Sequence, residues 1–152
     1  MQDYNLERFH KAQEMDYQTA LQEIKSGRKC SHWIWYIFPQ LKGLGYSFNS
    51  EYYGIADMGE ARAYLSDKYL ADRLHEICEA LLALEESNPY NIFGSPDDKK
   101  VKSCMTLFVL AADEPDSIYE KVLDKFYNGQ WDNRTLHMLN MEIRRERKKN
   151  DN

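Results

Sequence analysis

The stretch most informative about the fold is residues 95–112, which read SPDDKKVKSCMTLFVLAA. Its first residues favour a helix start, because Ser95 can cap the helix, Pro96 suits the first helical position and two acids follow in the first turn. Beyond Cys104 the sequence is apolar almost without interruption. A helix that is apolar on nearly every side has to be buried on several sides. We therefore predict that this helix is the central one and that Phe108 is buried.

Further helices are predicted on both sides of this stretch. Apolar residues recur there at spacings of three and four, and residues typical of helix ends flank them. Asp57 and Glu60 have the spacing of a capping box, while Asp67, Ser117 and Asp132 can each cap a following helix. The expected helices cover residues 6–26, 57–65, 67–85, 117–129 and 132–143.

The composition describes one folded domain and argues against a general nucleic-acid binder. The chain has 152 residues, enough for one core, and its 43% of hydrophobic residues is too high for a disordered chain. The net charge of −5 conflicts with the basic surface that binding to nucleic acid requires. The basic residues 144–149 are most simply a solvated helix end, with a nucleic-acid-binding tail as the alternative.

Cysteine, histidine and hydropathy patterns give further expectations. The three cysteines are odd in number and have no CxxC spacing, which favours a reducing compartment over a disulfide framework. The four histidines lie far apart without metal-ligand spacing. No stretch is apolar for long enough to span a membrane, and the first residues lack the pattern of a signal peptide. We expect a cytoplasmic protein without a membrane partner, a metal or a cofactor; the oligomeric state stays open.

Residues 28–40, RKCSHWIWYIFPQ, form the most unusual segment. Six of the seven residues from His32 to Phe38 are large and apolar or aromatic. Propensity alone favours a buried strand. Ser31 as a cap and Pro39 as a stop favour a short helix instead, and so short a run has no periodicity that decides between them.

Six motifs occur along the chain in this order: SHWIW (31–35), IFPQ (37–40), GLG (43–45), EARAYL (60–65), IFGSPDD (92–98) and SCMTLF (103–108). With these motifs the chain resembles the bacterial DUF1810 family, a domain of unknown function. The resemblance implies a mainly α-helical single domain, which favours the helix for residues 32–38, and it implies no established reaction. We therefore expect an all-α fold: a compact, single-domain, orthogonal assembly of about six to eight helices over residues 1–152, with an ordered core at about 5–143 and a basic C-terminal tail.

His32 is the candidate catalytic residue. In a helix capped by Ser31 it would lie in the first turn, where the helix dipole and the two cations before it disfavour the charged imidazolium. A neutral histidine beside Trp33 and Trp35 can act as a general base or hydrogen-bond a ligand. The alternative is a core histidine that donates to a backbone carbonyl.

Two further groups of residues are candidates for ligand binding. Arg28 and Lys29, together with the free N–H groups of a helix start, could hold an anion. The simpler alternative is an exposed helix-to-helix turn, where basic residues are common after a helix C-terminus. Lys99, Ser103 and Thr106 are spaced so that they share one face of the predicted central helix. If buried, the two hydroxyls need partners, which are either a ligand or the carbonyls four residues earlier.

These candidates lead to one hypothesis, a small-ligand site between residues 32–40 and residues 93–106. Aromatic walls, a histidine, an amide and hydroxyls suit a nucleotide-like or phosphate-bearing molecule, and whether the protein is an enzyme stays open. The rival hypothesis is a non-enzymatic protein–protein interaction module whose aromatic segment serves only as core. The residues expected at the site are His32 as the catalytic group and Arg28, Lys29, Trp33, Trp35, Gln40, Lys99, Ser103 and Thr106 as ligand-binding residues.

Overall fold

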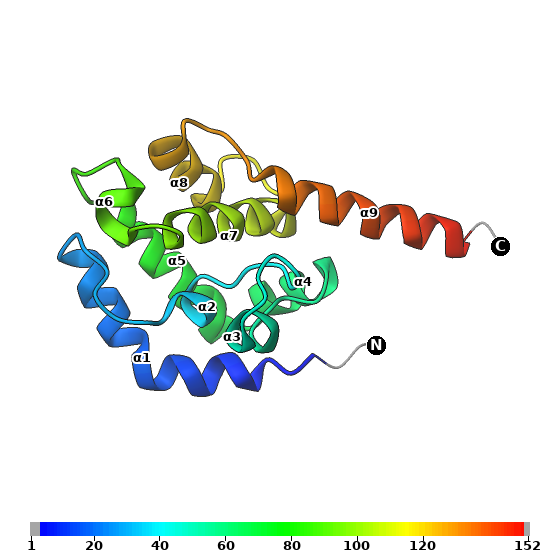
Figure 1. Cartoon of the computed structure of the whole chain (residues 1–152), viewed down its shortest axis with the longest axis horizontal. Helices are drawn as coiled ribbons and strands as arrows, with labels where there is room; N and C mark the ends of the chain where they lie inside the picture. Colours follow the sequence, from blue (N-terminus) through cyan, green and yellow to red (C-terminus); the bar gives the residue numbers. More distant parts are fainter. Residues whose placement is uncertain (1–3, 151–152) are drawn as a thin grey trace.

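The computed structural model describes residues 4–150, and these residues form an all-α fold as predicted. Nine helices lie within this range, six of them longer than seven residues, and the only strand-like pairing there is an isolated bridge between Leu41 and Ile55. The helices pack into one body, from which the C-terminal end of α9 extends (Figure 1). The helices are α1 (Glu7–Lys25), α2 (Ile34–Ile37), α3 (Phe48–Tyr52), α4 (Met58–Ser66), α5 (Lys68–Leu82), α6 (Pro89–Phe93), α7 (Asp97–Ala112), α8 (Ile118–Tyr127) and α9 (Asn133–Asn150).

The long helices begin where their capping residues predict. The side chains of Asp57, Asp67 and Ser117 each accept a hydrogen bond from a backbone N–H in the first turn of the next helix. Helix α9 continues to Asn150, past the predicted end at 143. The apolar pattern stops near 143, but the arginines, lysines and glutamate that follow are good helix formers. Among the described residues, no helix is both long and apolar enough to cross a membrane.

Two short helices, α3 and α6, are absent from the sequence prediction. Helix α3 lies in a segment that Gly43 and Gly45 mark as a loop, and it starts where the Ser47 hydroxyl accepts from the Ser50 N–H. Helix α6 is capped by Asn88. Each has five residues, too few for an apolar period to show.

Helix α7 is the central helix, as predicted. Phe108 has no exposed surface, and α7 contacts α2, α4, α6, α8 and α9. The predicted cap is wrong, however, because α7 begins at Asp97 with Pro96 in the N-cap position and Ser95 exposed. The carboxylate of Asp97 instead forms ion pairs with two lysines, which secures the first turn through side chains.

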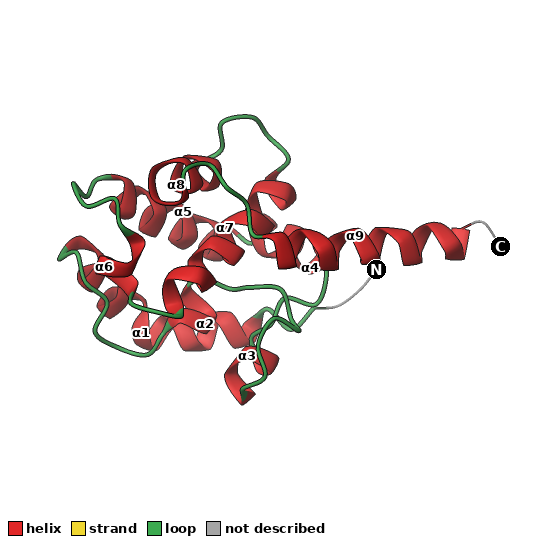
Figure 2. Ribbon diagram, turned by 45° about the horizontal axis from the view of Figure 1, so that its top comes forward, coloured by secondary structure: helices red, strands yellow, loops and turns green. Residues whose placement is uncertain are grey.

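The segment from Leu41 to Ile55, the 41–55 loop, is closed at its base and carries α3. Lys42 N–H donates to the Ile55 carbonyl at 2.7 Å, and Ile55 N–H donates to the Gln40 carbonyl at 2.8 Å. Figure 2 shows α3 standing out from the body beside α2. The loop also meets α9, since a Cβ on Gly43 would lie 2.9 Å from the Met138 methyl carbon. It therefore links α2 to the start of α9, where the candidate site lies.

Candidate ligand-binding cleft

The aromatic segment around α2 is mainly core. Trp33 is 1% exposed, and Ile34, Ile37 and Phe38 are buried with it. The helix starts only at Ile34, with Trp33 in the N-cap position and no side-chain cap. The segment is thus helical, as the family resemblance implied, but it is shorter than predicted.

Glu23 on α1 organises the turn that precedes α2. The Glu23 carboxylate accepts four hydrogen bonds: from Cys30 N–H at 2.7 Å, from Ser31 N–H at 2.9 Å, from the Ser31 hydroxyl at 2.6 Å and from Trp33 Nε1 at 2.9 Å. Burial alone would raise the pKa of Glu23, but the hydrogen bonds from Ser31, Cys30 and Trp33 outweigh it and lower the pKa to about 2. These charge-assisted hydrogen bonds hold the turn from Cys30 to Trp33 against α1. Trp33, predicted to contact a ligand, therefore has a structural partner.

His32 lies outside the helix, so its predicted place in a first turn is wrong. Its side chain is exposed. Gln40 and Ser103 line a common cleft, and His32 is not one of its lining residues. The reason is the late start of α2, which leaves His32 in the turn that Glu23 organises.

Gln40, Lys99 and Ser103 do meet, at a cleft of about 320 Å³. The cleft lies between the 41–55 loop, the first two turns of α7 and the start of α9. It brings together residues that are more than 90 positions apart in the sequence, from Gln40 to Arg134. The lining residues are Gln40, Leu44, Gly45, Ser50, Pro96, Lys99, Lys100, Ser103, Asp132 and Arg134.

The charge at this cleft is opposite in sign to the net charge of the chain. Lys99, Lys100 and Arg134 line it against one acid, Asp132, whereas the whole chain carries −5. Lys100 has an ion-pair partner, Asp97, at 3.4 Å, but Lys99 and Arg134 form no ion pair with any described residue. Helices α7 and α9 both begin here, and acidic side chains lie at each start: Asp97 and Asp98 in the first turn of α7, and Asp132 as the cap of α9.

The Asp132 carboxylate is already engaged as the N-cap of α9, as predicted. One of its oxygens, Oδ2, accepts from the Thr135 N–H at 3.0 Å and from the Thr135 hydroxyl at 2.6 Å. Asp132 therefore offsets part of the positive charge that Lys99, Lys100 and Arg134 place at the cleft.

The two predicted hydroxyls on α7 have different places. Ser103 lines the cleft and donates to the carbonyl of Lys99 at 3.1 Å, which leaves its oxygen free to accept. Thr106 has no exposed surface; it donates to the Lys102 carbonyl and accepts from the Asp132 N–H, both at 2.9 Å. Thr106 therefore fastens the start of α9 to α7 and does not reach the cleft.

A small chamber adjoins the cleft, and Trp35 is one of the residues that line it. Its volume is about 10 Å³, and it shares Gln40, Leu44, Gly45 and Ser50 with the cleft. Among the described residues, the indole Nε1 of Trp35 is the only buried side-chain nitrogen or oxygen without a hydrogen-bond partner. The Lys100 ammonium lies 5.3 Å from the centre of the Trp35 ring. The other residues of the chamber are Leu41, Asn49, Tyr53 and Gly54.

Arg28 and Lys29 lie at a different cavity, so the prediction that they share one site with Gln40 and Ser103 is wrong. This cavity measures about 400 Å³ and is bordered by residues 90–94. Lys29 N–H donates to the Ile92 carbonyl at 2.7 Å, which draws the segment towards α6. The Lys29 ammonium is committed to Asp97 at 2.9 Å.

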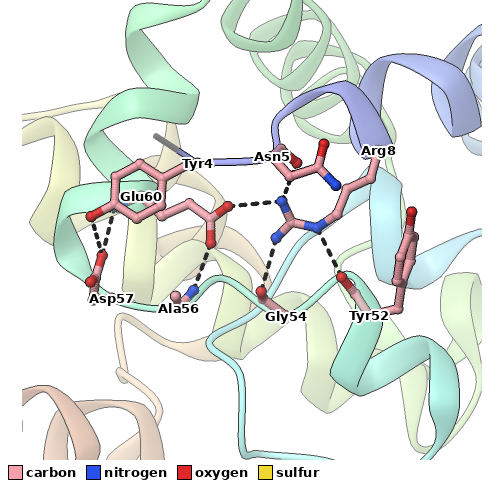
Figure 3. Close-up of polar contacts among 8 residues, drawn as sticks. All are labelled: Tyr4, Asn5, Arg8, Tyr52, Gly54, Ala56, Asp57 and Glu60. Carbon is pink, nitrogen blue, oxygen red and sulfur yellow. Dashed lines mark hydrogen bonds and ion pairs between the residues drawn. The ribbon is translucent and has the colours of Figure 1, made fainter. Parts of the chain in front are cut away.

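Arg8 holds the far side of the 41–55 loop, and no sequence pattern indicated this role. Its guanidinium donates to the carbonyls of Tyr52 at 2.8 Å and Gly54 at 3.0 Å, and pairs with Glu60 at 2.9 Å (Figure 3). The side chains of Arg8 and Glu60 are only 8% and 3% exposed. The second Glu60 oxygen accepts from the Ala56 N–H at 2.7 Å. This cluster is saturated with partners and therefore supports the wall of the chamber without being a site itself.

The sequence reasoning missed Lys100, Asp132 and Arg134 as members of the cleft. Asp132 was recognised only as a helix cap, and Arg134 follows it within the first turn. Nothing local shows that α9 begins beside α7, because the Thr106–Asp132 contact spans 26 residues. The useful signal was the coincidence of two helix starts with basic residues in each first turn.

Comparison with known proteins identifies the family. The chain matches the family described as "Protein of unknown function (DUF1810)" over residues 3–139. It also matches the crystal structure of the conserved hypothetical protein Rv1873 from Mycobacterium tuberculosis. That match has 41% sequence identity, covers 90% of this chain and 96% of that one, and has a TM-score of 0.86. No functionally curated protein matches. The chain belongs to the DUF1810 family.

Proposed function

We propose that the protein binds a small, phosphate-bearing ligand in the cleft. The observation that carries the proposal is the excess of cations there in an otherwise acidic chain, with Lys99 and Arg134 free of ion pairs to described residues. A phosphate group would form charge-assisted hydrogen bonds with both cations. Gln40 and Ser103 supply uncharged polar groups that orient the molecule.

The size of the cleft limits the ligand. A volume of about 320 Å³ is at the lower end of the range for small-molecule sites, roughly 300–1,000 Å³. It suits a ligand of the size of a mononucleotide or a sugar phosphate. The finer proposal is therefore that the ligand is nucleotide-like.

Binding, and not a particular reaction, is what the cleft supports. Its lining contains no histidine or cysteine, and its single carboxylate, Asp132, is engaged as a helix cap. The candidate base His32 is exposed and lines neither the cleft nor the chamber. A catalytic role for His32 stays a prediction from sequence to which the geometry adds no support.

Calorimetric titration with inorganic phosphate, pyrophosphate and AMP at fixed ionic strength tests the proposal. We expect at least one of these probes to bind the wild type, and the Lys99→Ala/Arg134→Ala variant to bind it at least about tenfold more weakly. The matched control is Lys11→Ala/Lys68→Ala, which removes two exposed cations away from the cleft and should bind as the wild type does. Equal weakening in both variants would show a general charge effect and refute the site.

An interaction module is the second candidate, because the 41–55 loop exposes large rings. Tyr46 is 91% exposed and Phe48 is 79% exposed. The Phe48 ring stacks on Tyr52, with ring centres 5.7 Å apart. Apolar surface of this kind often marks a contact with another protein. Failure of all three phosphate probes to bind the wild type would favour this candidate.

A further inference from the structure

We infer that the chamber behind the cleft receives one acceptor oxygen of the bound ligand, and that Trp35 Nε1 donates a hydrogen bond to it. The inference rests on the proposed function and adds a selectivity to it. The ligand must be an oxyanion that extends an oxygen past the cations of the cleft. Trp35 then makes the site selective for such oxyanions over anions that have no oxygen to place in the chamber.

The first step is the unpaired indole. Buried polar groups in folded proteins almost always have a hydrogen-bond partner, and an exception calls for an explanation. Trp35 Nε1 is the single exception among the described residues. Two positions earlier, Trp33 Nε1 donates to Glu23 at 2.9 Å. The same short segment thus pairs one indole within the protein and leaves the other unpaired and covered, so a ligand atom reaches it only when lining side chains move aside.

The second step is the size and chemistry of the chamber. A volume of about 10 Å³ is close to the minimum that holds one water-sized atom. An indole N–H can only donate, so the atom it meets has to be an acceptor. The amides of Gln40 and Asn49 and the hydroxyl of Ser50 are polar groups of the same lining. An oxygen fits this environment, whereas a methyl group or an ammonium leaves the indole unpaired.

The third step is the connection to the cleft. Gln40, Leu44, Gly45 and Ser50 border both spaces, so an atom in the chamber lies next to whatever fills the cleft. Lys100 lines the cleft, and its ammonium also lies over the Trp35 ring. A tetrahedral oxyanion can present oxygens in several directions at once. One can therefore enter the chamber while others face the cations.

The test observes the indole directly in the wild-type protein. The chain has three tryptophans, so a ¹H–¹⁵N spectrum contains three indole signals. Trp33→Phe and Trp35→Phe each remove one signal and assign it; if one variant fails to fold, the other and Trp131→Phe assign the rest by elimination. Inorganic phosphate, pyrophosphate and AMP are the probes. We expect the Trp35 proton to move downfield on binding, and the Trp33 proton to stay in place.

The binding constants give the second readout. Trp35→Phe should bind the probe at least about tenfold more weakly, because the buried donor is lost, and its melting temperature without the probe should stay close to that of the wild type. If the probe binds and binding depends on Lys99 and Arg134, but the Trp35 signal is static and Trp35→Phe binds normally, the inference is wrong and the proposed function stands. If no probe binds the wild type, the proposed function itself fails.

Discussion

Trp33 and Trp35 occupy the same seven-residue aromatic segment, yet they have opposite hydrogen-bonding states. Trp33 is 1% exposed, and its indole donates to the Glu23 carboxylate. Trp35 is half-buried, and its indole nitrogen is covered but unpaired. The first indole belongs to a closed structural cluster, and the second belongs to a residue that lines a small chamber beside a cationic cleft.

The same contrast separates two polar clusters on either side of the 41–55 loop. Around Arg8 and Glu60 every charge has a close partner, and both side chains are almost fully buried. In the cleft, Lys99 and Arg134 have no ion-pair partner among the described residues. A saturated polar cluster stabilises a fold, whereas groups left without partners are available to a ligand. Mutations should therefore affect stability on one side and binding on the other.

The largest effect on stability is expected from Arg8→Ala. The change leaves the Glu60 charge buried without its partner and frees the carbonyls of Tyr52 and Gly54. The free energy of unfolding should fall by about 3–5 kcal/mol in urea denaturation. Lys99→Ala in the cleft is the matched comparison and should change it by about 0.5 kcal/mol or less. Equal losses in the two variants would remove the distinction between the clusters.

Trp33→Phe should have the next largest effect. The substitution removes a donor to Glu23 and leaves space in a fully packed core. We expect a loss of about 2 kcal/mol in the free energy of unfolding, measured in the same way. A stability equal to that of the wild type would show that the Glu23 cluster does not stabilise the fold.

Acid should weaken the Glu23 cluster in a defined pH window. The pKa of Glu23 is about 2 in the folded protein against an ordinary value of 4.5, so the folded state favours the charged form. Its contribution to stability is fully present above pH 4.5 and is lost as the pH falls towards 2. Melting temperatures of the wild type and of Glu23→Gln should therefore converge in this window. A constant difference between them down to pH 2 would contradict the assignment.

Trp35→Phe should have the smallest effect of the tryptophan changes. The donor that it removes has no partner in the protein, so no hydrogen bond is broken. The free energy of unfolding should change by less than about 1 kcal/mol. A loss as large as that of Trp33→Phe would mean that the Trp35 indole has a structural partner after all.

Features set by near neighbours in the sequence were predictable. The caps at Asp57, Asp67, Ser117 and Asp132 each involve a bond to a residue three positions ahead. The burial of Phe108 followed from the apolar character of the whole turn around it. Such features depend on spacing along one helix, which the sequence displays directly.

The composition of the site was only partly predictable, because distant contacts form it. Ser31 was a plausible cap for α2, but its hydroxyl instead donates to Glu23 near the end of α1, and α2 begins only at Ile34. His32 therefore lies outside the helix. Arg134 reaches the cleft only because Thr106 binds the Asp132 backbone. The family resemblance settled the helical state of α2, where propensity alone favoured a strand.

Crystals grown with stoichiometric tungstate, a heavy oxyanion of phosphate-like shape, provide the most direct measurement of whether the cleft binds an oxyanion. Tungsten scatters anomalously, so a difference map locates the anion without reference to any variant. We expect the strongest peak in the cleft between Lys99 and Arg134, with an oxygen directed towards Trp35. A strongest peak in the cavity of Arg28 and Lys29, or no peak in the cleft, would contradict the proposal.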